Sequence, residues 1–120
     1  MYDYKMTESE YRFMKIIWEN NYISSSELVE QCKAVLDWKK STTYTVLKRL
    51  CEKGIFENNG GTVTAKLSRD DFYSLQSQRF VQDTFQGSLP AFLAAFTSGK
   101  RLSDQEVAQL RQLVQSFEEE

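Results

Sequence analysis

The sequence predicts a mostly helical protein with one small β-hairpin, and three observations lead to this class. Apolar residues recur at helical spacing in several segments, most of which follow a Ser or Thr that can cap a helix. Two short extended segments flank an Asn-Asn-Gly-Gly turn at residues 58–61. The 120 residues include a single Pro and five Gly, so few positions interrupt the helices.

Three helices are predicted in the first half of the chain. Thr7 and Glu10 have the spacing of a capping box at the start of the first helix. Gly54 follows the third, because a glycine readily adopts the left-handed conformation that ends a helix. Residues 22–23 form a short extended piece between the first two. The three helices run from Thr7 to Asn20, from Ser24 to Leu36 and from about Lys40 to Lys53.

A hairpin and three more helices are predicted after Gly54. The hairpin strands are Ile55–Glu57 and Thr62–Leu67, joined by residues that tolerate a positive φ. Ser103 and Glu106 have the capping-box spacing at the start of the last helix. The three helices run from Ser68 to about Phe85, from Pro90 to near Ser98 and from Ser103 through an apolar stripe that ends at Phe117.

The order helix, short strand, helix, turn, helix, hairpin is that of a winged helix-turn-helix, whose third helix enters the major groove of DNA. At 100° per residue, one side of the third helix is apolar and can pack on the first two helices. The opposite side carries hydroxyl and basic side chains, which suit base edges and phosphates. The candidate DNA-binding residues lie on this helix and at the hairpin turn: Lys39, Lys40, Ser41, Thr42, Tyr44, Thr45, Lys48, Arg49, Lys53, Asn59 and Gly60.

The charge distribution agrees with a local rather than a global nucleic-acid surface. The whole chain has 15 basic and 17 acidic residues, a formal charge of −2. Residues 39–53 contain five basic residues and one acidic residue, a local charge of +4. This segment predicts binding to duplex DNA with a strong dependence on salt. A winged-helix adaptor that binds a protein through the same face is the alternative hypothesis, and its binding would be nearly independent of salt.

The sequence lacks the residue types that most enzymes and metal sites use. It contains no His, and its two cysteines, Cys32 and Cys51, stand 19 positions apart without a C-x-x-C motif. A Ser or Cys nucleophile would therefore have no histidine to activate it. We expect no enzymatic activity, no metal and no cofactor. Both cysteines fall on inward helix faces and are expected to pack as small apolar side chains.

No segment of the sequence predicts insertion into a membrane. No run approaches the roughly 18 apolar residues of a membrane helix, and residues 1–12 lack the apolar core of a signal peptide. We expect a cytoplasmic protein.

The aromatic content changes near residue 71, because six of the eight Phe residues lie from Phe72 onward. We place a boundary there, with a winged-helix DNA-binding domain over residues 1–71 and a helical dimerisation domain over residues 72–120. Three amphipathic helices form little core alone, so their apolar faces are expected to meet a second copy of the chain rather than fold back on the winged domain. The candidate interface residues are Phe80, Phe85, Leu89, Phe92, Leu93, Phe96, Leu110, Leu113, Val114 and Phe117.

Four motifs in order resemble the penicillinase-repressor family of bacterial transcriptional repressors. The first is the segment from Thr7 to Trp18, which resembles the family's opening motif. The third and fourth are the Gly87-Ser88 turn and the segment from Leu102 to Leu110. The second, between the first motif and these two, comprises Trp38, Thr42, Thr45, Leu47, Arg49, Leu50, Lys53 and Gly54.

The resemblance implies a winged-helix homodimer that represses genes by binding a short dyad operator, with Thr42, Thr45 and Arg49 in the DNA-reading role. It also implies a membrane-bound sensor metalloprotease as a partner, which cleaves the dimerisation segment before an aromatic residue. Ala95-Phe96 is the matching position. The chain departs from the family pattern in that Lys39-Lys40 replace a Ser-Pro pair, Thr62 stands at a wing position often occupied by Arg, and Ala95 replaces an Asn.

Overall fold

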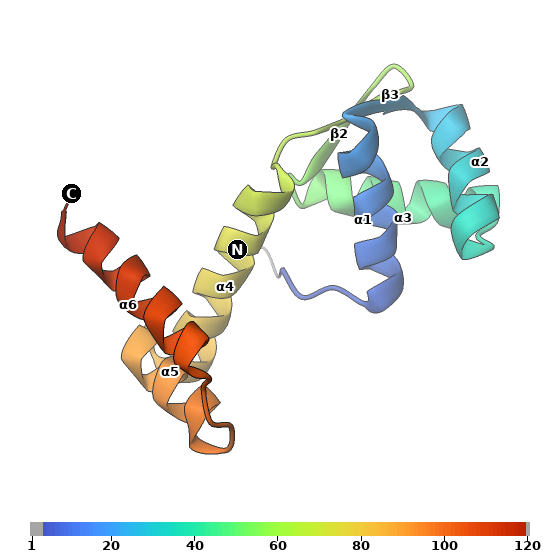
Figure 1. Cartoon of the computed structure of the whole chain (residues 1–120). Helices are drawn as coiled ribbons and strands as arrows, with labels where there is room; N and C mark the ends of the chain where they lie inside the picture. The colour runs from blue at the N-terminus through green and yellow to red at the C-terminus, as the bar shows by residue number, and fades with distance from the viewer. Residues whose placement is uncertain (1–3, 120) are drawn as a thin grey trace. The chain divides into compact units, whose positions relative to one another are not determined.

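The fold is mostly helical with one small antiparallel sheet (Figure 1). The structure is a computed structural model, and it describes residues 4–119. In chain order the elements are α1 (Glu8–Asn20), β1 (Tyr22–Ser24), α2 (Ser25–Leu36), α3 (Lys40–Glu52), β2 (Phe56–Asn59), β3 (Thr62–Ala65), α4 (Arg69–Phe85), α5 (Leu89–Ser98) and α6 (Asp104–Glu118). This order confirms the predicted mainly helical fold with a winged helix-turn-helix. Within residues 4–119, no helix is long and apolar enough to cross a membrane.

Side-chain caps mark the N-terminal ends of most helices where the sequence predicts them. The Thr7 hydroxyl accepts a hydrogen bond from the Glu10 amide at 3.2 Å, and the Glu10 carboxylate accepts one from the Thr7 amide at 3.0 Å. Ser103 and Glu106 form the same reciprocal pair at the start of α6. These contacts satisfy amides that have no partner within the helix, which is why the helices begin there.

The sheet has three strands in the order β1-β3-β2, all antiparallel. The sequence predicts the β2–β3 hairpin but treats residues 22–23 only as an extended piece. In the structure β1 pairs with β3, with Ile23 opposite Val63. The Ser25 amide, the first in α2, donates to the Gly61 carbonyl at 2.8 Å. The turn of the hairpin is therefore attached to the start of α2.

The described residues form two compact units that divide between Arg79 and Phe80. The boundary expected at residue 71 stays a prediction; Phe72, which follows it, is fully buried in the core of the first unit. That core brings together α1, α2, α3, the sheet and the start of α4, and its fully buried apolar side chains include Phe13, Met14, Ile17, Leu28, Leu50, Ile55, Val63 and Phe72. Trp18 and Trp38 are half-buried at its edge, and the Trp38 ring stacks on Phe13 with centroids 5.4 Å apart.

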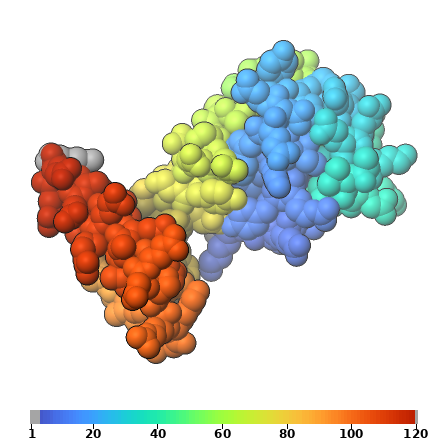
Figure 2. All heavy atoms as spheres, viewed as in Figure 1, coloured from blue at the N-terminus to red at the C-terminus, as the bar shows by residue number. Residues whose placement is uncertain are grey.

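The second unit contains the end of α4 together with α5 and α6. Phe80, Phe85 and Phe92 form an aromatic cluster, with centroids 5.6–6.0 Å apart. Within residues 4–119, neither α5 nor α6 has a buried side chain. In the face that Figure 2 shows, the orange and red atoms of these helices lie at the surface.

Candidate nucleic-acid interface

The third helix, α3, has one buried side and one exposed side, as the sequence predicts. Thr43, Val46, Leu47 and Leu50 are buried and fix the helix to the core. At 100° per residue, the centre of the opposite side is a row formed by Ser41, Thr45, Lys48 and Glu52. All four are exposed, so this row is a polar ridge along the helix.

Two further pairs of side chains lie on the flanks of this ridge. Thr42 and Arg49 are on the flank toward α1, where Arg49 contacts Glu10. Tyr44 and Cys51 are on the flank toward β2, where they line a cavity together with Asn58. The ridge and flanks together therefore contain six of the predicted DNA-binding residues: Ser41, Thr42, Tyr44, Thr45, Lys48 and Arg49.

The N-terminus of α3 differs from those of its neighbours. Lys39 occupies the N-cap position without a side-chain hydrogen bond, and no acidic residue stands in the first turn. In α1, α2, α5 and α6 a Thr or Ser side chain accepts a hydrogen bond from an amide of the first turn. The α3 end presents uncapped amides and the positive end of the helix dipole beside the exposed Lys39 and Lys40.

One hydroxyl on the ridge already has a partner within the helix. The Thr45 hydroxyl donates to the Ser41 carbonyl at 2.9 Å. Its hydrogen is therefore directed along the helix, while its oxygen lone pairs and methyl group face outward.

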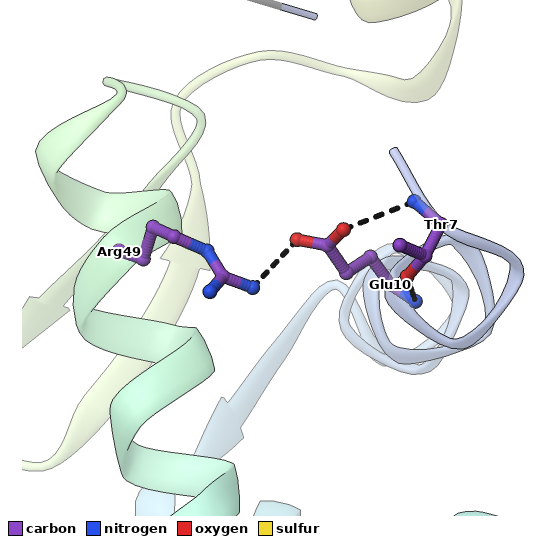
Figure 3. Close-up of polar contacts among 3 residues, drawn as sticks. All are labelled: Thr7, Glu10 and Arg49. Carbon is purple, nitrogen blue, oxygen red and sulfur yellow. Dashed lines mark hydrogen bonds and ion pairs between the residues drawn. The ribbon is translucent and has the colours of Figure 1, made fainter. Parts of the chain in front are cut away.

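Arg49 is bound by a residue that sequence reasoning did not connect with it. Its Nη2 atom donates to Glu10 Oε2 at 2.7 Å (Figure 3). The Arg49 side chain is 49% exposed, whereas the Glu10 side chain is 13% exposed. The sequence predicts Glu10 only as the capping-box partner of Thr7. No local pattern could have indicated the ion pair, because the two residues are 39 positions apart and only the fold brings them together.

The pKa of Glu10 lies below its ordinary value. Burial acts to raise this pKa, but hydrogen bonds from Thr7 and from the Arg49 guanidinium stabilise the carboxylate and together outweigh it. Glu10 is therefore charged at neutral pH, and the pair is a charge-assisted hydrogen bond.

The remaining predicted contacts lie at the hairpin turn and at the end of α3. Asn59 and Gly60 are exposed, and Gly60 has a φ of 58°. The Gly61 amide donates to the Asn58 side chain at 3.1 Å, which closes a short turn. Lys53 is half-buried at the C-cap of α3. The predicted residues thus fall into three places: the ridge and flanks of α3, its two ends, and the tip of the hairpin.

The two cysteines have the packing that the sequence predicts. Cys32 is fully buried in the core and Cys51 is half-buried. Burial raises the pKa of the Cys32 thiol to about 11, and a hydrogen bond with Thr43 only partly opposes it. Burial, followed by the charge of Glu57, also raises the pKa of Cys51. Both are thiols rather than reactive thiolates at neutral pH.

The order of elements and the outward polar side of α3 define a winged helix-turn-helix of the kind that binds DNA. The family model described as penicillinase repressor matches residues 6–116. The chain belongs to the penicillinase repressor family, which confirms the resemblance found in the sequence. As a member of this family it is a DNA-binding repressor.

Two curated relatives illustrate the similarity. The methicillin resistance regulatory protein MecI of Staphylococcus aureus is 25% identical over 115 residues, which cover 92% of this chain and 94% of that protein. The penicillinase repressor of Bacillus licheniformis is also 25% identical over 115 residues, covering 92% of this chain and 90% of that protein. Among solved structures, the reduced form of MarR from E. coli matches with a TM-score of 0.46 and 22% identity, covering 94% of this chain and 75% of that chain.

Proposed function

We propose that the chain is a homodimeric repressor that binds a short dyad operator through the exposed side of α3. The observation that carries this proposal is the two-sided character of α3. Its apolar side is fixed in the core, so Ser41, Thr45 and Lys48 point away from the protein. A rigid helix with short polar side chains on its outer face can lie in the major groove. A repressor bound there would exclude other proteins from a promoter.

The phosphate backbone is contacted by groups that surround this ridge. Lys39 and Lys40 stand beside the uncapped α3 N-terminus, where amides and the helix dipole favour an anion. Lys48 supplies a further positive charge on the ridge itself. The exposed turn at Asn59-Gly60 offers backbone amides to a phosphate, and Lys53 lies at the opposite end of α3. Such contacts set the position of the helix without reading sequence.

The base edges are contacted by the hydroxyl side chains of α3. Ser41 and Thr42 carry hydroxyls that can donate or accept hydrogen bonds at the first turns of the helix. Thr45 offers oxygen lone pairs and a methyl group, because its hydroxyl hydrogen is directed to the Ser41 carbonyl. A methyl group of this kind suits the thymine methyl. Tyr44 extends the same surface toward the hairpin.

The second unit supplies the dimer contact. Apolar side chains that a stable monomer would bury remain exposed along α4, α5 and α6, and Phe117 is 58% exposed. Burying these faces against a second copy would remove them from water and produce a two-fold dimer. Two α3 helices would then face half-sites one helical turn apart, about 34 Å. The residues that support this interface are Phe80, Phe85, Leu89, Phe92, Leu93, Phe96, Leu110, Leu113, Val114 and Phe117.

Cleavage at Ala95-Phe96 by a sensor metalloprotease is the proposed route of inactivation. In the single chain both side chains are exposed on α5, a short helix without a buried residue, so local opening of this helix costs little when the chain is not paired. A cut there would remove α6 and the end of α5 from the rest of the chain and weaken the dimer. A chain that ends at Ala95 tests this step. It should be monomeric and bind the operator more weakly than the full chain, and an unchanged dimer would contradict the proposal.

The experiment that tests DNA binding is selection from a pool of random 30-base-pair duplexes with the full chain. We expect enrichment of a dyad sequence. The affinity for it should fall with added salt at a log–log slope of roughly −5 to −9, for about three to five phosphates neutralised by each of two helices. A pool without enrichment, or binding that salt does not weaken, would favour a protein-binding adaptor instead.

A further inference from the structure

The Glu10 carboxylate is held by the start of its own helix as well as by Arg49. Glu10 Oε1 accepts a hydrogen bond from the Thr7 amide at 3.0 Å, and Oε2 accepts one from Arg49 Nη2 at 2.7 Å. Figure 3 shows the two oxygens directed to these two partners. A preorganised carboxylate loses little conformational freedom in the ion pair, so this contact has an advantage over an ordinary surface pair of two flexible side chains.

Arg49 also stands away from the part of α3 that is suited to reading bases. Recognition helices contact base edges mainly with residues near their N-terminus. Arg49 belongs to the last turn of α3, nine positions after Lys40, which is about 13 Å along a helix at 1.5 Å per residue. It lies on the flank toward α1 rather than on the ridge of Ser41, Thr45 and Lys48.

The N-terminal part of α1 also contacts α2, the other helix of the helix-turn-helix. Arg12 Nη2 donates to the Val35 carbonyl, in the last turn of α2, at 3.0 Å. Glu10 and Arg12 thus connect the first turns of α1 to α3 and to α2, each through a hydrogen bond that involves a charged group. The start of α1 is therefore hydrogen-bonded both to the end of α2 and to the last turn of α3.

From this geometry we infer that Glu10 and Arg49 form a clamp that orients α3 for DNA binding, and that Arg49 reads no base. Glu10 is the positioning residue of the clamp. The inference rests on the proposed function, and it reassigns Arg49, which the family resemblance places among the reading residues. A guanidinium that moved to a guanine would leave the mostly buried Glu10 carboxylate with the Thr7 amide but without a cation, which is unfavourable.

The test compares Glu10→Gln, Arg49→Gln and the double variant with the wild-type chain. Gln at the third helical position preserves the capping box, so Glu10→Gln removes the charge without removing the cap. The DNA probe is a duplex enriched by the wild-type chain from a random 30-base-pair pool. A second selection with each variant measures base preference. Melting followed by the fluorescence of Trp18 and Trp38, both in the first unit, measures the stability of the winged domain.

A clamp predicts that either single variant weakens binding about threefold to tenfold and that the double variant is no weaker than either single one. The preferred bases should stay the same in all three variants. Each single variant should also lower the melting temperature by about 2–6 °C, again without additivity. Glu8→Gln, an exposed acid in the same turn of α1, is the matched control and should leave both measurements unchanged.

Two results would overturn the inference. The first is a loss of preference at one base position in Arg49→Gln but not in Glu10→Gln, which identifies Arg49 as a reader. The second is additive melting shifts, which show that the two side chains do not act together. If the wild-type chain enriches no duplex, the proposed function fails, and the additivity of the melting shifts alone decides whether the clamp exists.

Discussion

The ring of Phe72 packs against Trp18 with centroids 5.7 Å apart, and this contact makes the start of α4 part of the winged-helix core. Phe72 is fully buried, and the ring of Tyr4 meets it edge-on at 5.8 Å. The indole Nε1 of Trp18 donates to the Leu67 carbonyl at 3.0 Å, which fixes the segment just before α4. The first unit therefore depends on residues beyond the hairpin.

Replacement of Phe72 by Ala should destabilise the first unit by about 3–5 kcal/mol, because it leaves a cavity among rings that cannot fully close it. Urea unfolding followed by tryptophan fluorescence measures this loss, since Trp18 contacts Phe72 directly. Ser77→Ala, at an exposed position of the same helix, is the control and should change the free energy of unfolding by less than about 0.5 kcal/mol. Equal stability of the two variants would contradict the assignment of Phe72 to this core.

The sequence predicts those features that depend on residues close together in the chain. The Thr7–Glu10 capping box spans three positions, and the structure confirms it. The start of α6 at Ser103 and the Gly60-Gly61 turn are local in the same sense. Short-range hydrogen bonds and backbone preferences determine these features, so the residue types alone indicate them.

The features that the sequence does not predict depend on distant partners. β1 pairs with β3 about forty positions away, which three residues cannot indicate by themselves. Phe72 follows the aromatic pattern of the later helices but packs in the first unit, and Arg49 has the residue type of a DNA reader but is bound to Glu10. For the candidate site, the sequence indicates which side chains of α3 are polar, whereas the fold decides which of them are already engaged.

The contribution of Glu10 to stability should depend on pH in a defined direction. Its pKa is lower in the folded state than the ordinary value of 4.5, so folding favours the charged form. The stabilisation is therefore complete above about pH 4.5 and is lost as the pH falls through the lower folded pKa. At pH 7 the free energy of unfolding of the wild type should exceed that of Glu10→Gln by about 0.5–1 kcal/mol, a modest value because Arg49 is half exposed. This difference in the free energy of unfolding should disappear at acid pH.

Urea unfolding of both proteins from pH 7 to pH 3 measures this difference. Because the other carboxyl groups titrate in both proteins, the difference isolates Glu10. A gap that widens as the pH falls would show that the sign of the pKa shift is wrong.

Lys48→Ala should weaken DNA binding by a similar factor on all sequences. Lys48 lies on the exposed ridge of α3, where its ammonium group can neutralise a phosphate. The slope of log affinity against log salt should become less steep by about 1 for each helix bound, or about 2 for a dimer. Lys15→Ala, at an exposed position of α1 where Lys15 pairs with Glu19, is the charge-matched control and should keep the wild-type slope. An unchanged slope in Lys48→Ala would remove Lys48 from the interface.

Thr45→Val should affect base preference rather than salt dependence. Valine keeps the shape and a methyl group but removes the oxygen that faces outward, at a cost of about 1 kcal/mol toward the preferred base. Repeated selection from the random duplex pool measures the change. Weaker binding with an unaltered preferred sequence would show that Thr45 supports the helix without reading a base.

If the proposed dimer forms through the apolar side of α6, Leu113→Asp should leave the chain monomeric. Leu113 lies on the apolar side of α6 with Leu110, Val114 and Phe117, and it is 52% exposed in the single chain. A carboxylate at this position would have to lose its hydration in the interface without a partner, which strongly disfavours association. Gln112→Asp adds the same charge on the opposite side of α6 and should remain dimeric. Sedimentation at micromolar concentration distinguishes the two, and a dimeric Leu113→Asp variant with wild-type operator affinity would exclude this face of α6 from the interface.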